Sequence, residues 1–198
     1  DYQILLLTHE RQFFELFASE VKSEGWTISV FEWSKDDGVK VEEAAIDIRE
    51  RILKKFKSKE IDGLGNDIRI YTEKGLKQIA NNIEALVAFR YNVTNEKRTA
   101  SELLDAVQGR LSKKSNELMG KANILKLKRM PMFLANVTSH DNEFLENIED
   151  LETIWNDVEK TLNVFYCEDC KKYISMEYFD NVENKIRGKC GKSNYYWN

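Results

Sequence analysis

The stretch Phe144–Leu162, FLENIEDLETIWNDVEKTL, decides the fold of this chain. Its large apolar side chains recur at alternating steps of four and three residues, at Phe144, Ile148, Leu151, Trp155, Val158 and Leu162. This spacing aligns them along one side of an α-helix, as a seam suited to antiparallel packing or a short coiled coil. Acidic residues flank the seam, which is more typical of a solvated helix face than of an acidic recognition surface. The sequence therefore predicts a helix packed in a bundle.

Helical spacing also marks the middle of the chain. A first pattern comprises Val41, Ala45, Ile48, Ile52 and Phe56. Two further patterns cover 67–91 and 99–118, separated from their neighbours by a break at 62–66 and a polar loop at 92–98. The inward positions predicted for these two helices are Ile79, Ile83, Leu86, Leu103, Leu104, Val107 and Leu111. Together these patterns predict a helical bundle over 41–163.

The first 40 residues differ from the bundle, because strand and helix patterns alternate there. The continuously apolar segment Gln3–Thr8 predicts a strand buried on both faces. An amphipathic helix over Phe13–Val21 and a second strand over Thr27–Trp33 follow, with a turn signal at Asp37–Gly38. A buried strand needs neighbouring strands, so we expect the chain to be a fragment of a longer protein.

The amino-acid composition limits the kinds of protein to which the chain can belong. The chain has 198 residues, of which 42% are hydrophobic, enough to form a core. No apolar run approaches the roughly 20 residues of a membrane span, and no signal peptide is recognisable. We therefore expect a soluble cytoplasmic protein with no membrane partner. The net charge of −4 argues against a nucleic-acid binder that uses its whole surface, although a local basic patch is compatible with it.

All three cysteines lie near the C-terminus, at Cys167, Cys170 and Cys190. A Cys-x-x-Cys pair followed about 20 residues later by a second cysteine turn is typical of a zinc ribbon. Tetrahedral zinc takes four ligands, and Gly188 stands where a fourth cysteine would fit. The site has lost a ligand, or a residue was altered, or a water or a distant group completes it. The alternative is a zinc-free hairpin held by its aromatic residues.

The C-terminal segment also interleaves aromatic and basic residues, as nucleic-acid-binding modules do. Six Lys and Arg residues stand against five acidic ones over 164–198, which favours an ordinary solvated surface. The whole sequence predicts the α+β class and a mostly helical bundle. A short α/β piece covers 1–40, the bundle covers 41–163, and a zinc-ribbon-like β-hairpin, with Zn²⁺ as the expected ion, covers 164–198.

A histidine closes the first apolar segment, Leu5-Leu6-Leu7-Thr8-His9. Open α/β sheets bind ligands at the carboxyl ends of their strands. An imidazole there can donate to a terminal phosphate or orient a water. The alternative is a structural histidine, partly buried and bonded to neighbouring backbone, and spacing alone favours that alternative.

The segment Leu5–Phe14 resembles the switch-histidine segment of ABC-type ATPase heads of the SMC and RecF group. This resemblance implies that His9 is a catalytic residue that senses the γ-phosphate of ATP bound with Mg²⁺. The phosphate loop of that family, G-x-x-x-x-G-K-[ST], is not in this sequence. We therefore expect the chain to be inactive as an ATPase by itself, and ATP with Mg²⁺ to bind only in the complete head.

Three later pieces resemble, in order, the helical tail of bacterial ATPases of this type. They are Gly75 with Ala80–Glu84, Leu103–Leu104 and Ser139–Asp141. The resemblance implies an ATPase that acts on or near DNA or RNA, in genome maintenance or antiviral (phage) defence. Its expected partners are the N-terminal ATPase lobe and a second copy bound through the heads. The rival function is a non-enzymatic interaction module, whose bundle and ribbon bind a protein or a nucleic acid.

Such tails resemble HEPN-like helical bundles, some of which are ribonucleases with an arginine four to six residues before a histidine. Neither His9 nor His140 has an arginine at that offset, so we do not expect ribonuclease activity. Ser139 or Asp141 is instead expected to cap a helix. Three consecutive side chains point apart and cannot form a catalytic triad.

Overall fold

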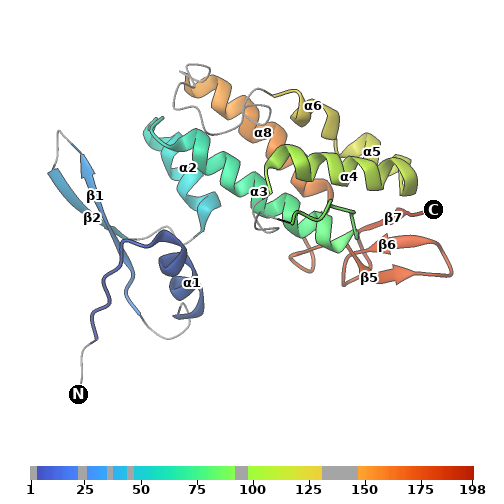
Figure 1. Ribbon diagram of the computed structural model, residues 1–198, viewed down its shortest axis with the longest axis horizontal. Helices are drawn as coiled ribbons and strands as arrows, with labels where there is room; N and C mark the ends of the chain where they lie inside the picture. Colours follow the sequence, from blue (N-terminus) through green and yellow to red (C-terminus); the bar gives the residue numbers. More distant parts are fainter. Residues whose placement is uncertain (1–3, 22–25, 35–37, 44–46, 92–97, 131–146) are drawn as a thin grey trace. The chain divides into compact units, whose positions relative to one another are not determined.

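The computed structural model describes residues 4–21, 26–34, 38–43, 47–91, 98–130 and 147–198 (Figure 1). The fold mixes helices with antiparallel sheets and is predominantly helical, which confirms the predicted class at that level. The chain divides into two compact units, Asp1–Lys54 and Lys55–Asn198. Over the described residues, every helix falls short of the length or the apolar character that a bilayer crossing requires.

The first unit contains the predicted amphipathic helix as α1, Arg11–Val21. The ring centroids of Phe13 and Phe17 lie 5.9 Å apart, and the planes of the two rings are nearly parallel. The Trp26 ring meets Phe17 edge-on at 5.1 Å. Ala18 and Val21 are buried. The apolar spacing of this segment therefore predicted its helix correctly.

A two-stranded hairpin follows α1. The predicted second strand is confirmed as β1, Ser29–Ser34, which pairs antiparallel with β2, Gly38–Glu43. The helical pattern predicted from Val41 is wrong at its start, because Val41 lies in β2 and α2 spans only Ile48–Ser58. Alternating valines favour a strand when aromatic residues lie directly across from them.

The apolar segment before α1 forms no strand, contrary to prediction. Residues 4–10 are irregular, and Ile4 and Leu5 are 70% and 81% exposed. A doubly buried strand requires hydrogen-bonded neighbours and cover on both faces. None of the sheets in the described residues includes this segment. His9 is therefore exposed in an irregular segment rather than at the end of a strand, and its switch role stays a prediction.

The second unit is a helical bundle with a C-terminal β-region. Its helices are α3 (Leu64–Asn82), α4 (Ala100–Lys114), α5 (Asn116–Lys121), α6 (Ile124–Lys128) and α8 (Ile148–Val164). Side-chain caps fix several starts: Thr99 and Glu102 form a capping box on α4, and the Asn147 side chain accepts from the Asp150 N–H on α8 at 2.8 Å. The earlier cap expected at 139–141 lies outside the described residues.

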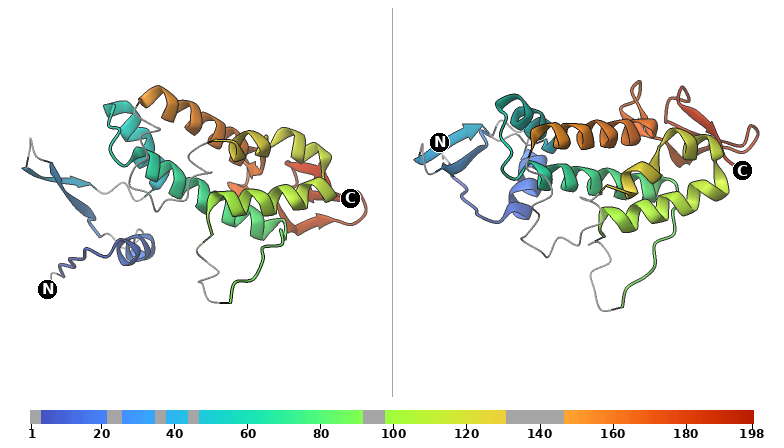
Figure 2. Two further views of the ribbon diagram at one scale, coloured as in Figure 1. Left: turned by 45° about the horizontal axis from the view of Figure 1, so that its top comes forward. Right: turned by 90° about the horizontal axis from the view of Figure 1, so that it is seen from above.

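The predicted seam of the Phe144–Leu162 helix is buried inside the bundle. Leu151, Trp155, Val158 and Leu162 are buried on α8, which packs against α3, α5 and α6. Figure 2 shows α3 lying between α8 and α4. Ile154 and Thr161 are buried as well, so the contact stripe is wider than a two-per-heptad seam. Phe144 lies outside the described residues.

Two predicted helices end earlier than their apolar spacing indicates. The helix expected over 67–91 stops at Asn82, and Leu86, predicted inward, is 88% exposed. Glu84 adopts a left-handed conformation with φ 54°, which cannot continue the helix. The helix expected over 99–118 is divided at Ser115, whose side chain caps α5. At both places the apolar spacing continues, but the helix ends because of the backbone conformation of Glu84 or the cap formed by Ser115.

Gly75 on α3 lies against Leu162 of α8, and we expect this position not to accommodate a side chain. A Cβ at Gly75 would lie 2.8 Å from Leu162 Cδ1, and Leu162 is itself buried. Gly75→Val should lower the free energy of unfolding by about 1–3 kcal/mol through overpacking. The matched control is Gly109→Val on α4, where a Cβ meets nothing within 4 Å. Equal effects of the two variants in denaturant titrations would contradict this packing.

The C-terminal segment forms two small antiparallel sheets. One pairs β3 (Tyr166–Cys167) with β4 (Lys172–Tyr173). The other has the order β5 (Ser175–Asp180), β6 (Lys185–Arg187) and β7 (Asn194–Tyr196).

Both ends of this segment are tied to the helices. Asn82 Nδ2 donates to the Ile174 carbonyl at 3.2 Å, and the Tyr195 hydroxyl donates to the Val164 carbonyl at 3.0 Å. Trp197 is buried, and the Arg110 guanidinium lies 5.6 Å from its ring centroid. The predicted hairpin therefore exists, and it packs on the bundle as part of the same unit.

Candidate metal centre

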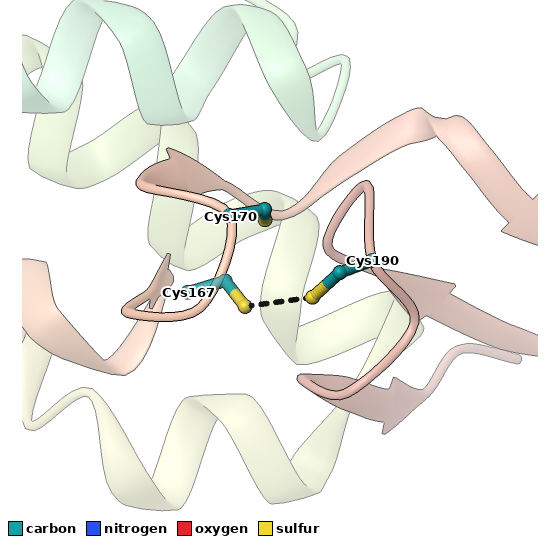
Figure 3. Close-up of side chains that lie close together, drawn as sticks. All are labelled: Cys167, Cys170 and Cys190. Carbon is teal, nitrogen blue, oxygen red and sulfur yellow. Dashed lines mark hydrogen bonds between the residues drawn. The ribbon is translucent and has the colours of Figure 1, made fainter.

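Two turns of the C-terminal segment bring the three cysteines together (Figure 3). Cys167 ends β3, Cys170 lies in the turn to β4, and Cys190 lies in the turn between β6 and β7. The Sγ atoms of Cys167 and Cys190 are 3.4 Å apart, and all three sulfurs lie within 4.8 Å of one another. The predicted cluster is thereby confirmed.

These sulfur separations suit a tetrahedral ion. Zn–S bonds of about 2.3 Å in a tetrahedron place sulfurs about 3.8 Å apart. All three thiols are free rather than disulfide-bonded. Cys167 is buried, Cys170 is half-buried and Cys190 is exposed. Among the His, Cys, Asp and Glu residues within the described ranges, this is the group placed to hold a metal. The donor set therefore fits a zinc ion.

In both cysteine turns, the residue after the last cysteine has a left-handed backbone conformation. Cys170 is followed by Lys171 with φ 53°, and Cys190 is followed by Gly191 with φ 76°. The Gly191 N–H donates to the Gly188 carbonyl at 2.8 Å and closes the second turn. A left-handed residue after the cysteine reverses the chain, so each turn projects its thiol toward the other.

Gly188 lies beside the thiols, as the sequence predicts. A Cβ at Gly188 would be 3.3 Å from Cys167 Sγ and 3.5 Å from Cys170 Sγ. It would also be 3.0 Å from Cys167 Cβ, so Cys167 must yield by a few tenths of an ångström to admit one. Glycine has no side chain that could act as a ligand, so this position adds nothing to the three thiols.

The surroundings favour the thiolate at Cys167. The Ser193 hydroxyl donates a hydrogen bond to the Cys167 sulfur, and the Cys170 backbone N–H donates a second one with a smaller effect. Together they lower the pKa of Cys167 to about 6, although burial of the thiol acts to raise it. At Cys190 the Lys192 backbone N–H acts to lower the pKa, but the hydrogen bond with Cys167 and partial loss of solvent contact raise it overall. Metal binding at neutral pH therefore has to displace a proton from Cys190.

Adding a fourth thiol at Gly188 should strengthen metal binding. Gly188→Cys should raise zinc affinity by about tenfold or more, since even outer partners of a metal change affinity by that much. Competition with a chromophoric chelator measures the change. Gly109→Cys is the control, because it adds a thiol on α4 where a Cβ has no heavy atom, and so no cysteine sulfur, within 4 Å. An affinity unchanged by Gly188→Cys would show that this corner does not face the ion.

Among the described residues, His9 is not one of the residues that form the cluster. His9 is exposed in the first unit, and His140 lies outside the described residues. The structure adds one residue that spacing did not indicate: Ser193, whose hydroxyl reaches Cys167. A serine three residues after Cys190 carries no recognised metal signature, so nothing in the sequence marked it.

Comparisons with protein-family models, with curated proteins and with solved structures found no match to this chain.

Proposed function

We propose that residues 164–198 form a zinc-ribbon-like module in which Cys167, Cys170 and Cys190 hold a structural zinc ion. The chain then acts as a non-enzymatic binding module built from this ribbon and the helical bundle. The observation that carries the proposal is the convergence of three thiols from two separate turns, with sulfurs within 4.8 Å of one another.

The chemistry of the donors supports zinc over other ions. Soft thiolate ligands select zinc, Cu(I) or iron–sulfur clusters over Mg²⁺ and Ca²⁺, and a tetrahedral sulfur site is typical of zinc. A turn of the Cys-x-x-Cys kind with a left-handed residue after its second thiol supplies two of the three ligands. The ion would cross-link the β3–β4 hairpin to the β6–β7 turn.

The neighbouring carboxylates support a structural role for the ion over a catalytic one. A zinc enzyme needs a free acid or base near the metal-bound water. Glu168 accepts a hydrogen bond from Lys171 at 2.7 Å, and Asp169 accepts one from Lys192 at 2.6 Å. These ion pairs occupy the carboxylates that lie nearest in sequence to the thiols.

Metal analysis of the purified chain tests this function. We expect about one zinc per chain, strongly reduced in Cys170→Ser and in Cys190→Ser because each removes one of three protein ligands. His9→Ala is the control for a distant fourth ligand and should leave the zinc content unchanged. A chain without zinc, or zinc retained by both cysteine variants, would contradict the proposal.

A second candidate function rests on His9. We propose that His9 serves as the γ-phosphate-sensing residue of an SMC/RecF-like ATPase head completed by a further lobe, which acts on or near DNA or RNA. Its support is the likeness of Leu5–Phe14 to the switch-histidine segment and the exposure of His9, which leaves the imidazole accessible. The test is the coding sequence upstream of Asp1. A phosphate loop and an Asp-Glu pair ending a strand are expected there, and neither being found would contradict this candidate.

A further inference from the structure

A pocket of about 420 Å³ opens next to the first cysteine turn, between the C-terminal part of α3 and the strands β4 and β5. Its lining includes Gln78, Tyr166, Lys171, Lys172, Tyr173 and Tyr178. The volume falls in the range of about 300–1,000 Å³ that is typical of small-ligand sites. Neither the metal centre nor the ATPase resemblance makes use of these side chains.

An irregular strand register shapes one wall of this pocket. Ser175 pairs with Arg187 and Asp180 with Lys185, so β5 advances five residues while β6 advances two. Successive side chains of a regular strand point to opposite faces. The irregularity allows the neighbours Glu177 and Tyr178 both to line the pocket.

Lys171 is held in a backbone conformation that favours glycine. Its φ is 53°, and the matching position after Cys190 is occupied by Gly191. The Lys171 side chain lines the pocket, is 70% exposed, and is paired with Glu168 near the surface. An ammonium group has three N–H donors, so Lys171 can keep its pair with Glu168 and also donate to a ligand anion in the pocket.

The groups in the lining match those of a nucleotide. Tyrosine rings provide stacking surfaces for bases, and adjacent ammonium groups neutralise backbone phosphates. The exposed Gln78 amide can donate to and accept from a base edge. Glu177 repels phosphate from its own side of the pocket, which leaves Lys171 and Lys172 as the phosphate side.

We propose that this pocket binds one nucleotide of a single-stranded nucleic acid, with the base against a tyrosine ring and the adjoining phosphates at Lys171 and Lys172. The inference rests on the proposed function, because it names the ligand of the binding module. Cys170 immediately precedes both lysines. The metal therefore fixes the turn that presents them, and metal removal weakens binding.

Fluorescence anisotropy with labelled oligothymidylate and oligouridylate of about ten nucleotides tests the pocket. The zinc-loaded full chain should bind at least one of them. Tyr178→Leu, which keeps bulk but removes the ring, should weaken binding by about fivefold to hundredfold. Lys171→Gln should weaken it and reduce the slope of log affinity against log salt by about 0.7.

Lys192→Gln is a closely matched control. Lys192 is 68% exposed and pairs with Asp169 at 2.6 Å, whereas Lys171 is 70% exposed and pairs with Glu168 at 2.7 Å. Both variants remove one charge and one ion pair beside a cysteine turn, but Lys192 is not part of the pocket lining. Lys192→Gln should leave the salt slope unchanged, and an equal loss in both variants would overturn the proposal.

Competition and metal content separate the remaining outcomes. Displacement of the oligonucleotide by duplex DNA, by an acidic peptide or by inorganic phosphate as readily as by unlabelled single strand would overturn the proposal. No binding by chain that contains zinc would overturn the pocket alone. Binding that depends on Tyr178 in chain without zinc would uphold the pocket and overturn the metal proposal.

Discussion

Replacing Trp155 with alanine should lower the free energy of unfolding by about 3–5 kcal/mol. Trp155 is buried on the seam of α8. Its ring centroid lies 4.9 Å from that of Tyr71 on α3 and 6.4 Å from that of Phe56 on α2. Removing the indole leaves a cavity at the contact of three helices, and packed cores close such cavities only in part.

Denaturant unfolding followed by circular dichroism measures this effect without relying on tryptophan emission. The control is Trp33→Ala, because Trp33 lies on β1 and is 73% exposed. That variant should change stability by no more than about 0.5 kcal/mol. If both variants had equally small effects on stability, the α8 seam would not be packed inside the bundle, and it would be a partner-binding face instead.

Removing the metal should loosen residues 165–197 and leave the bundle folded. The β-strands there are two to six residues long, and zinc would join two turns that belong to separate sheets and are otherwise linked by the Lys192–Asp169 ion pair and the hydrogen bond of Ser193 to Cys167. Zinc binding energy is folding energy of the segment that it cross-links. The cores of α3, α4 and α8 consist of buried apolar side chains and do not depend on the ion.

Hydrogen exchange before and after chelation measures this selectivity. Backbone amides of β5–β7 should lose most of their protection, whereas those of α3 and α8 should keep theirs. Cys170→Ser without chelator should reproduce the chelated pattern. Loss of protection throughout residues 55–198 would show that the metal supports the whole unit, and no loss anywhere would show that it supports none of it.

The helical bundle could be predicted from the sequence because its apolar residues recur at helical spacing. The spacing of Leu151, Trp155 and Val158 predicts that they lie on one buried side of a helix, and their burial on α8 confirms this. Helix ends were less predictable. Glu84 and Ser115 interrupt helices through backbone conformation and capping, and neither effect disturbs the apolar pattern.

The first unit shows where apolar runs are ambiguous. Val39 and Val41 form a strand because Trp33 and Phe31 lie across from them, a pairing that depends on the intervening turn. The run Ile4–Leu7 lacks any paired strand in the described residues, and it stays irregular and exposed. Hydrophobicity alone does not supply the hydrogen-bonded neighbours that a strand requires.

The candidate site was predictable in its ligands but not in its surroundings. Cysteine spacing identified all three thiols and the corner at Gly188, since metal ligands follow strict geometry. Ser193 and the tyrosine-lined pocket depend on how the sheets fold onto α3. No periodic or motif signal encodes that arrangement.

X-ray absorption at the zinc edge of the purified full chain tests the three-thiolate zinc site. We expect about three sulfur neighbours at about 2.3 Å and one lighter oxygen or nitrogen ligand, because Cys167, Cys170 and Cys190 supply the protein ligands and Gly188 supplies none. Zinc surrounded by oxygen and nitrogen alone, or no zinc in the purified chain, would contradict it.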